Sequence, residues 1–219
     1  MTPRPLRPYQ RRRTRPVAIL VSVLAVVALA TWTTVLITSS GGAGTTSCPA
    51  PAAGTAGTVV EASSLEPVTP AAAAASKVRV LNGGGQRGQA NLVAAQLGDL
   101  GFAEAGAPGN DPLYPDGDLD CRGQIRFGEA GAAAAATLAI VVPCTELVRD
   151  ARGDDSVDLA VGTAFSDVKP SSTARDVLDQ LANPSVGDGS GNADESGAGT
   201  PPGPAVDPAL LQKARDTPC

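Results

Sequence analysis

The chain has 219 residues, with 17 basic and 22 acidic side chains, four cysteines and no histidine. The absence of histidine excludes a Ser-His-Asp triad, a Cys-His pair and a histidine-ligated zinc site. Aromatic residues make up only 3% of the chain, so a stacking platform for sugars or bases is poorly supplied. The frequent Ala, Gly, Pro and Arg residues are associated with GC-rich genomes such as those of actinobacteria.

The N-terminus carries the clearest topological signal. Six arginines and no acidic residue lie within residues 1–16, and residues 17–37 form an apolar run without any charged side chain. As a helix this run would reach roughly 32 Å, enough for a hydrocarbon core about 30 Å thick. The arginines predict a cytoplasmic tail over 1–16, a single transmembrane helix over 17–37 and an extracytoplasmic remainder, in a single-pass protein of the cell membrane.

A cleaved signal peptide is the alternative reading of the same region. The tripeptide Ala28-Leu29-Ala30 has the form of a cleavage site. Apolar character nevertheless continues through Trp32 to Ile37, and tryptophan is common at membrane interfaces. These residues favour an uncleaved anchor.

The charge changes sign beyond the N-terminal tail. Without the six arginines the chain has 11 basic against 22 acidic residues, a net charge of −11. This charge repels nucleic acid at long range, so we expect no nucleic-acid partner. Binding to an anionic wall polymer would need a local basic patch or bridging cations.

Composition divides the exterior part into three segments. Residues 38–76 are rich in Gly, Ala, Thr, Pro and Ser and are predicted to be a flexible stalk. Residues 77–183 contain the periodic apolar patterns of one domain. Residues 184–219 form a Pro/Gly-rich acidic tail, in which residues 208–214 have the pattern of a short helix.

The first half of the domain begins with a strand at 78–81, which ends at a glycine-rich loop. Apolar residues spaced as on one helical face follow over 90–100, and Gly101 supplies a C-terminal stop. A weak second strand is predicted over 102–107, and residues 108–120 form a loop rich in turn formers.

The second half predicts a strand at 124–127, a helix at 129–141, a strand at 158–162 and a helix at 173–182 that is capped by Ser172. The core order is therefore strand-helix-strand-strand-helix-strand. It predicts the α+β class, as a small two-layer sandwich carried on a single transmembrane helix.

Four motifs in this domain resemble the LytR C-terminal domain family over residues 77–169. They are Val-Arg-Val-Leu-Asn-Gly at 78–83, Gly-Gln-Ala at 88–90, Ile-Arg-Phe-Gly at 125–128 and Leu-Ala-Val-Gly-Thr-Ala-Phe at 159–165. In that family the domain usually follows a LytR-CpsA-Psr phosphotransferase domain, which attaches glycopolymers to peptidoglycan. No such domain precedes residue 77, so the resemblance implies a membrane-anchored envelope protein without its own catalytic activity.

The loop after the first strand carries a glycine pattern of a kind found in ligand-binding loops. Glycines at 83, 85 and 88 formally match the dinucleotide-binding pattern, and a helix N-terminus follows. The domain is too short for a doubly wound nucleotide fold, so a structural turn is favoured over a weak phosphate or carboxylate site. If the loop does contact a ligand or partner, we expect the contact to involve Asn82, Gly83, Gly85, Arg87 and Gly88.

Three aspartates, Asp116, Asp118 and Asp120, begin like a calcium loop. The sixth position is Cys121 instead of glycine, and the twelfth is Phe127 instead of glutamate. We therefore expect no EF-hand, no metal site and no cofactor.

The cysteines lie outside the cytoplasm in this topology, where disulfides form. Three pairings of Cys48, Cys121, Cys144 and Cys219 are possible. We favour Cys121 with Cys144, because these residues flank adjacent elements, and then by elimination Cys48 with Cys219. Intermolecular bridging by one of the latter two is the alternative.

We therefore expect a protein without catalytic residues that maintains envelope integrity by binding a cell-wall glycopolymer or another envelope protein. One alternative is an enzyme of glycopolymer attachment to peptidoglycan, with carboxylates such as Asp116, Asp118 or Glu129 as acid and base. The other is an accessory subunit of a LytR-type transferase.

Overall fold

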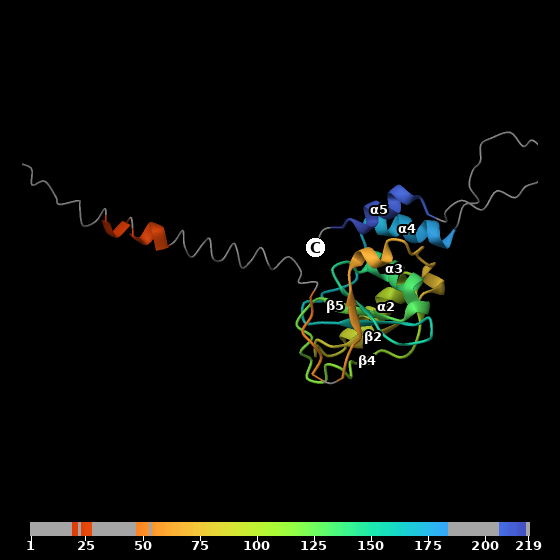
Figure 1. Cartoon of the computed structure of the whole chain (residues 1–219), viewed down its shortest axis with the longest axis horizontal. Helices are drawn as coiled ribbons and strands as arrows, with labels where there is room; N and C mark the ends of the chain where they lie inside the picture. The colour runs from red at the N-terminus through yellow and green to blue at the C-terminus, as the bar shows by residue number, and fades with distance from the viewer. Residues whose placement is uncertain (1–18, 22, 28–46, 53, 184–205, 218–219) are drawn as a thin grey trace, which may run out of the picture. The chain divides into compact units, whose positions relative to one another are not determined.

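The computed structural model describes residues 19–21, 23–27, 47–52, 54–183 and 206–217 (Figure 1). The chain divides into an N-terminal unit, Met1–Ala43, and a second unit, Gly44–Cys219. In the first unit the described residues are helical, and their large apolar side chains are more than half exposed. Within the described residues no helix has both the length and the apolar character needed to cross a membrane. Most of the predicted segment 17–37 and all of the tail 1–16 lie outside the described residues.

The second unit is built on a seven-stranded mixed sheet. Its strands are β1 (Thr58–Val60), β2 (Lys77–Asn82), β3 (Ala103–Glu104), β4 (Gly109–Asn110), β5 (Gly123–Phe127), β6 (Glu146–Arg149) and β7 (Val157–Val161). The spatial order is β1-β6-β5-β7-β2-β3, and β4 also pairs with β2. Strand β2 is parallel to β3, β4 and β7, and β5 is parallel to β6. The β5–β7 and β1–β6 pairs are antiparallel.

Four helices accompany the sheet: α2 (Gln89–Asp99), α3 (Ala132–Val141), α4 (Ser172–Ala182) and α5 (Pro208–Arg215). Short 3₁₀ turns occupy η1 (Ala62–Leu65), η2 (Ala73–Ala75) and η3 (Glu129–Gly131). Helices α2 and α3 are the crossovers of two parallel strand-helix-strand units, β2-α2-β3 and β5-α3-β6.

The main core lies between the sheet and helices α2 and α3. Alternate residues of the central strands point into it, and Ile125, Phe127, Leu159 and Val161 have no exposed surface. Helix α2 contributes its stripe at i, i+3 and i+7, led by the fully buried Val93. The apolar residues that alternate along the strands and those that recur along one face of α2 therefore pack together in one layer.

A second tier of helices packs on α3. A separate apolar cluster joins α3 through Ile140, α4 through Val177 and Leu181, and α5 through Ala214. Figure 1 shows α4 and α5 on the far side of α3 from the strands. The α+β class is confirmed, but the helices are stacked two deep where we predicted one helical layer.

The N-terminal cap of α4 differs by one residue from the prediction. The hydroxyl of Ser171, not of Ser172, accepts a hydrogen bond from the backbone N–H of Ala174 at 3.1 Å. Ser171 has extended backbone angles, which suit a residue that precedes the first helical turn.

The described part of the predicted stalk 38–76 belongs to the folded unit, so the prediction of a flexible stalk is wrong there. Strand β1 adds to the sheet beside β6, Leu65 of η1 is buried in the main core, and Cys48 is disulfide-bonded. The segment is too poor in large apolar residues to signal a core by itself. Its order comes from partners far along the chain.

Part of the predicted tail 184–219 is also folded onto the domain. Helix α5 is capped at its N-terminus by Asp207, whose carboxylate accepts hydrogen bonds from the N–H groups of Ala209 and Leu210. Near its other end, the Arg215 guanidinium donates to the carbonyl oxygens of Leu65, Glu66 and Val68 in and after η1, at 2.7–3.2 Å. The beginning and the end of the described domain are thereby joined.

Three loops meet so closely beside the C-terminal ends of β2 and β7 that side chains are excluded. A Cβ atom on Gly162 would collide with the backbone oxygens of Leu119 and Cys121, and one on Gly84 would collide with the backbone of Gly162. The glycines here serve this close approach.

We predict that Gly162→Ala destabilises the domain by more than about 2 kcal/mol, because backbone atoms cannot move aside as a flexible side chain can. Gly98→Ala is the matched control. Gly98 is exposed in α2 with open space around it, so alanine there should stabilise the domain by about 0.5–1 kcal/mol. Urea unfolding of the full chain in detergent measures both. Equal stabilities of the two variants would contradict the packing seen here.

Candidate functional site

The sheet face opposite α2 and α3 carries the polar residues of the central strands. In β2, β5 and β7 the residues that point away from the main core include Arg79, Arg126 and Asp158. Their backbones are in register across the sheet, with Asp158 opposite both arginines. Strand pairing therefore places Asp158 of β7 between Arg79 of β2 and Arg126 of β5.

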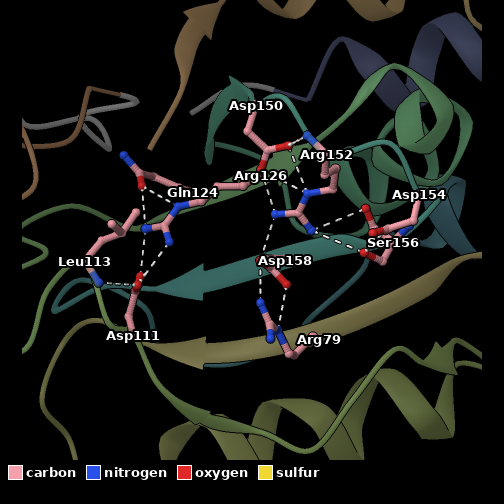
Figure 2. A network of polar contacts seen from close by, with 10 residues as sticks. All are labelled: Arg79, Asp111, Leu113, Gln124, Arg126, Asp150, Arg152, Asp154, Ser156 and Asp158. Carbon is pink, nitrogen blue, oxygen red and sulfur yellow. Dashed lines mark hydrogen bonds and ion pairs between the residues drawn. The ribbon is translucent and has the colours of Figure 1, made fainter. Parts of the chain in front are cut away.

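Asp158 is the centre of the first part of this polar network (Figure 2). Its carboxylate accepts two hydrogen bonds from Arg79 at 2.9 Å and one from Arg152 at 2.8 Å. Arg152 is also held by Asp150, with contacts of 2.6 and 2.9 Å. Burial alone would raise the pKa of Asp158, but the hydrogen bonds from the two arginines outweigh burial and lower it.

The pKa values of the two arginines shift in the opposite direction, upward. The hydrogen bond to Asp158 raises the pKa of Arg79. Burial by itself would lower the pKa of Arg152, but hydrogen bonds to Asp150 and Asp158 raise it. Arg79, Arg152 and Asp158 are therefore held in their charged forms at neutral pH.

The second part of the network is a buried ion pair between Arg126 and Asp111. Two parallel hydrogen bonds of 2.7 and 3.0 Å join the groups, whose side chains are 4% and 0% exposed. Gln124 accepts two further hydrogen bonds from Arg126 through its side-chain oxygen, at 2.7 and 3.0 Å. The backbone N–H of Leu113 also donates to Asp111 at 3.0 Å. The pair is thus compensated by geometry and by neighbouring polar groups.

A third part connects the network to the N-terminal segment. The Gln124 side-chain NH₂ donates to Glu146 at 2.6 Å, and Glu146 accepts from the backbone N–H of Cys48 at 3.0 Å. The Tyr114 hydroxyl donates to the carbonyl oxygen of Pro49 at 2.6 Å. A disulfide between Cys48 and Cys121 fixes the same segment to the end of the loop that covers this face.

This disulfide shows that both favoured cysteine pairings are wrong. Because Cys48 bonds to Cys121 across 73 residues, Cys121 is not paired with Cys144, and Cys48 is not paired with Cys219. We placed Cys48 in a flexible stalk, so its proximity to Cys121 had no sequence signal. Cys144 is disulfide-bonded as well, and Cys219 lies outside the described residues.

The glycine loop is packed as a structural turn. Gly83 is buried, whereas Gly85, Arg87 and Gly88 are exposed. The Asn82 side-chain NH₂ donates to the carbonyl oxygen of Gln86 at 2.8 Å, which closes the loop on itself. A Cβ atom at Gly83 would meet the side chain of Leu119, so the covering loop occupies the space beside this glycine.

The acidic candidates do not converge. Asp116, Asp118 and Asp120 are exposed in the loop before β5, and Asp120 accepts a hydrogen bond from Thr163 at 3.2 Å. Glu129 follows the opposite end of β5, about 16 Å away along a five-residue strand. Among the residues that the structure describes, no group of three or more acidic or cysteine side chains could hold a metal ion.

Sequence reasoning missed the polar network, although one signal for it was present. Charged residues interrupt otherwise apolar strands at Arg79, Arg126 and Asp158. Alternation indicates that these side chains share a face, but strand order and register decide which of them meet. Asp111 and Arg152 come from loops, and neither has a periodic signal.

We predict that Asp158→Asn lowers the free energy of unfolding at pH 7 by about 1–3 kcal/mol, because two arginines lose a charged acceptor. The folded pKa of Asp158 is lowered. Its contribution is therefore complete above the unfolded value of about 3.9 and is lost as the pH falls through the folded value. The acid limb of the stability curve should become shallower in Asp158→Asn and remain unchanged in the exposed-loop control Asp118→Asn. An unchanged acid limb in Asp158→Asn would show that the contacts of Asp158 with its two arginines contribute nothing to stability.

We also predict that replacing Cys48 and Cys121 together by alanine lowers stability by about 4 kcal/mol, the chain-entropy value for a loop of this length. Urea unfolding of the full chain without reductant measures the difference. Peptide mapping of the unreduced wild type should recover the Cys48–Cys121 link. Recovery of Cys121 linked to Cys144 would overturn this assignment.

Comparison with known proteins places this geometry in a family. Residues 75–165 match the family model described as LytR cell envelope-related transcriptional attenuator. The chain is similar to the cell envelope integrity protein Cei of Mycobacterium tuberculosis, with 41% identity over 97% of this chain and 93% of that protein.

A solved structure agrees with the fold. The soluble domain of a conserved hypothetical secreted protein from Mycobacterium marinum superposes with a TM-score of 0.60 and 44% sequence identity, covering 74% of this chain and 98% of that domain. Similarity over nearly the full length and over the folded domain leads to one assignment: the chain belongs to the family of Cei-like cell envelope integrity proteins with a LytR C-terminal domain.

Proposed function

We propose that the chain is a non-catalytic, single-pass membrane protein whose extracytoplasmic domain maintains envelope integrity by binding a wall component or a partner protein. The observation that carries the proposal is the similarity to Cei along almost the whole chain. Similarity confined to residues 75–165 would support only a shared domain. Here it covers 97% of the chain, far more than the domain alone.

Two features support an extracytoplasmic position for the domain. Arginines concentrated before residues 17–37 favour retention of the N-terminus in the cytoplasm. The Cys48–Cys121 disulfide suits an oxidising compartment, because cytosolic thiols are kept reduced. Since these signals come from different parts of the chain, their agreement strengthens the proposal.

The polar network supports a binding role over hydrolysis. A carboxylate pair that works as acid and base needs one member protonated near neutral pH. Asp111 and Asp158 are instead each held by two hydrogen bonds from an arginine, and a third from Arg152 also reaches Asp158. These contacts stabilise the sheet face and the loop over it, and a rigid face is suited to presenting binding surfaces at the domain's edges.

The test is complementation of a strain that lacks its own copy of the gene. We predict that the full chain restores resistance to detergent and to wall-active antibiotics. A form in which residues 1–37 are replaced by an unrelated single-pass anchor of the same orientation should also restore resistance. A form that lacks residues 1–37 should fail, because its domain stays in the cytoplasm.

A form with a cleavable signal peptide in place of residues 1–37 serves as the control for anchoring. Its failure would show that the domain must be held at the membrane. Restoration by the cytoplasmic form would contradict the proposed sidedness. Turnover of a lipid-linked glycan by the purified full chain would contradict a non-catalytic role.

A further inference from the structure

Strand β1 is an edge of the sheet with little protection. Among the described residues it pairs with β6 on one side and with no strand on the other. Its sequence Thr-Val-Val contains neither the lysine nor the proline that often guards an edge. Val59 is 59% exposed, and Leu92 on α2 is the only other large apolar side chain of the described domain with comparable exposure.

A groove of about 550 Å³ lies where β1 meets β6, η1, α3 and the end of α5. Its apolar lining comes mainly from β1, η1, α3 and β6, and includes Val59, Val60, Leu65, Ala139, Ile140 and Leu147. An unpaired strand edge next to an apolar groove is the arrangement that accepts an extended peptide. Main-chain hydrogen bonds supply affinity there, and alternate side chains enter the groove.

The charged side chains at the rim of the groove indicate which charge an occupant should carry. Glu61, Glu66 and Asp216 line it and are exposed, and no ion pair found within the described residues involves them. Arg215 is the single cation among the lining residues. It is already committed to three backbone carbonyl oxygens. Three exposed carboxylates and the buried carboxylate of Glu146, against one engaged guanidinium, favour a basic occupant.

Charge also disfavours two other occupants. A second copy of the chain would bring an identical acidic rim to a symmetric contact, and like charges would face each other. An anionic lipid could place an acyl chain in the groove, but its headgroup would meet the same carboxylates. An acyl chain would also leave the backbone groups of the β1 edge without partners.

We propose that the β1 edge and its groove bind an extended polypeptide segment with alternating apolar and basic side chains, which adds to the sheet as a further strand. The inference rests on the proposed function, since it takes the partner of the extracytoplasmic domain to be a protein. Val59 and the main chain of β1 make the apolar and hydrogen-bonding contacts, and Glu61, Glu66 and Asp216 meet the basic side chains.

The experiment is a selection of random ten-residue peptides displayed on phage against the full chain in zwitterionic nanodiscs, with counter-selection against the Val59→Lys variant. We expect enriched peptides that alternate apolar residues with lysine or arginine. A synthetic copy, measured by fluorescence anisotropy, should bind Val59→Lys roughly tenfold more weakly, the equivalent of about 1.4 kcal/mol. Glu66→Gln, which preserves size and removes only charge, should weaken binding severalfold.

Leu92→Lys is the matched control, because it places the same charge at an equally exposed apolar site on α2. Its affinity should equal that of the wild type. Hydrogen exchange should slow at residues 58–61 when peptide is bound, and circular dichroism checks that each variant is folded.

Three results would overturn the inference. One is the absence of any peptide that distinguishes wild type from Val59→Lys, and another is enrichment of acidic peptides. The third is a native mass spectrum in which the wild type retains added palmitate and the Ala139→Trp variant does not. That result would assign the groove to an acyl chain. Successful complementation by the full chain together with any of these results would refute strand addition and leave the proposed function standing.

Discussion

A guanidinium group in the dry interior must be paired, and this requirement at Arg126 organises one whole face of the domain. Its partner Asp111 belongs to a loop, so the loop has to close over the sheet before the charge is compensated. Closure is secured by the disulfide from Cys48 to Cys121 and by the Tyr114 hydroxyl on Pro49. The N-terminal segment is thereby as much a part of this face as the strands are.

The two faces of the sheet differ in the kind of contacts that they make. One is a conventional apolar layer under α2 and α3, and the other combines apolar contacts with a charged network centred on Asp158 and Arg126. Because the network is satisfied internally, it offers little free chemistry to a ligand. The surface that we propose for recognition lies at the periphery, where the β1 edge meets α3, η1 and the end of α5. This division agrees with a protein that binds by shape and rim charge.

Local signals predicted the core of the fold, because strands β2, β5 and β7 and helices α2 and α4 carry apolar residues at strand or helix spacing, and α3 is a run of alanine and larger apolar residues. Strand β1, with three residues, and β6, with two apolar residues between charged ones, lacked such a stripe. Their pairing with each other is decided by tertiary contacts. The cysteine pairing failed for the same reason, since it depends on where a segment without its own core comes to lie. Motifs identified the family, but the pairing of Asp158 with Arg79 depends on the strand register, and its pairing with Arg152 depends on a loop.

The covalent link at Cys48 has a mechanical consequence. Tension applied to the chain from its N-terminal side meets the domain first at this residue, and the sulfur bridge passes the load directly to Cys121. Cys121 lies two residues before β5, which sits between β6 and β7 inside the sheet. A pull therefore loads an interior strand instead of unzipping β1 from the edge one hydrogen bond at a time. If this disulfide were reduced, the same pull would act first on β1 at the edge of the sheet, and its pairing with β6 would be lost one hydrogen bond at a time.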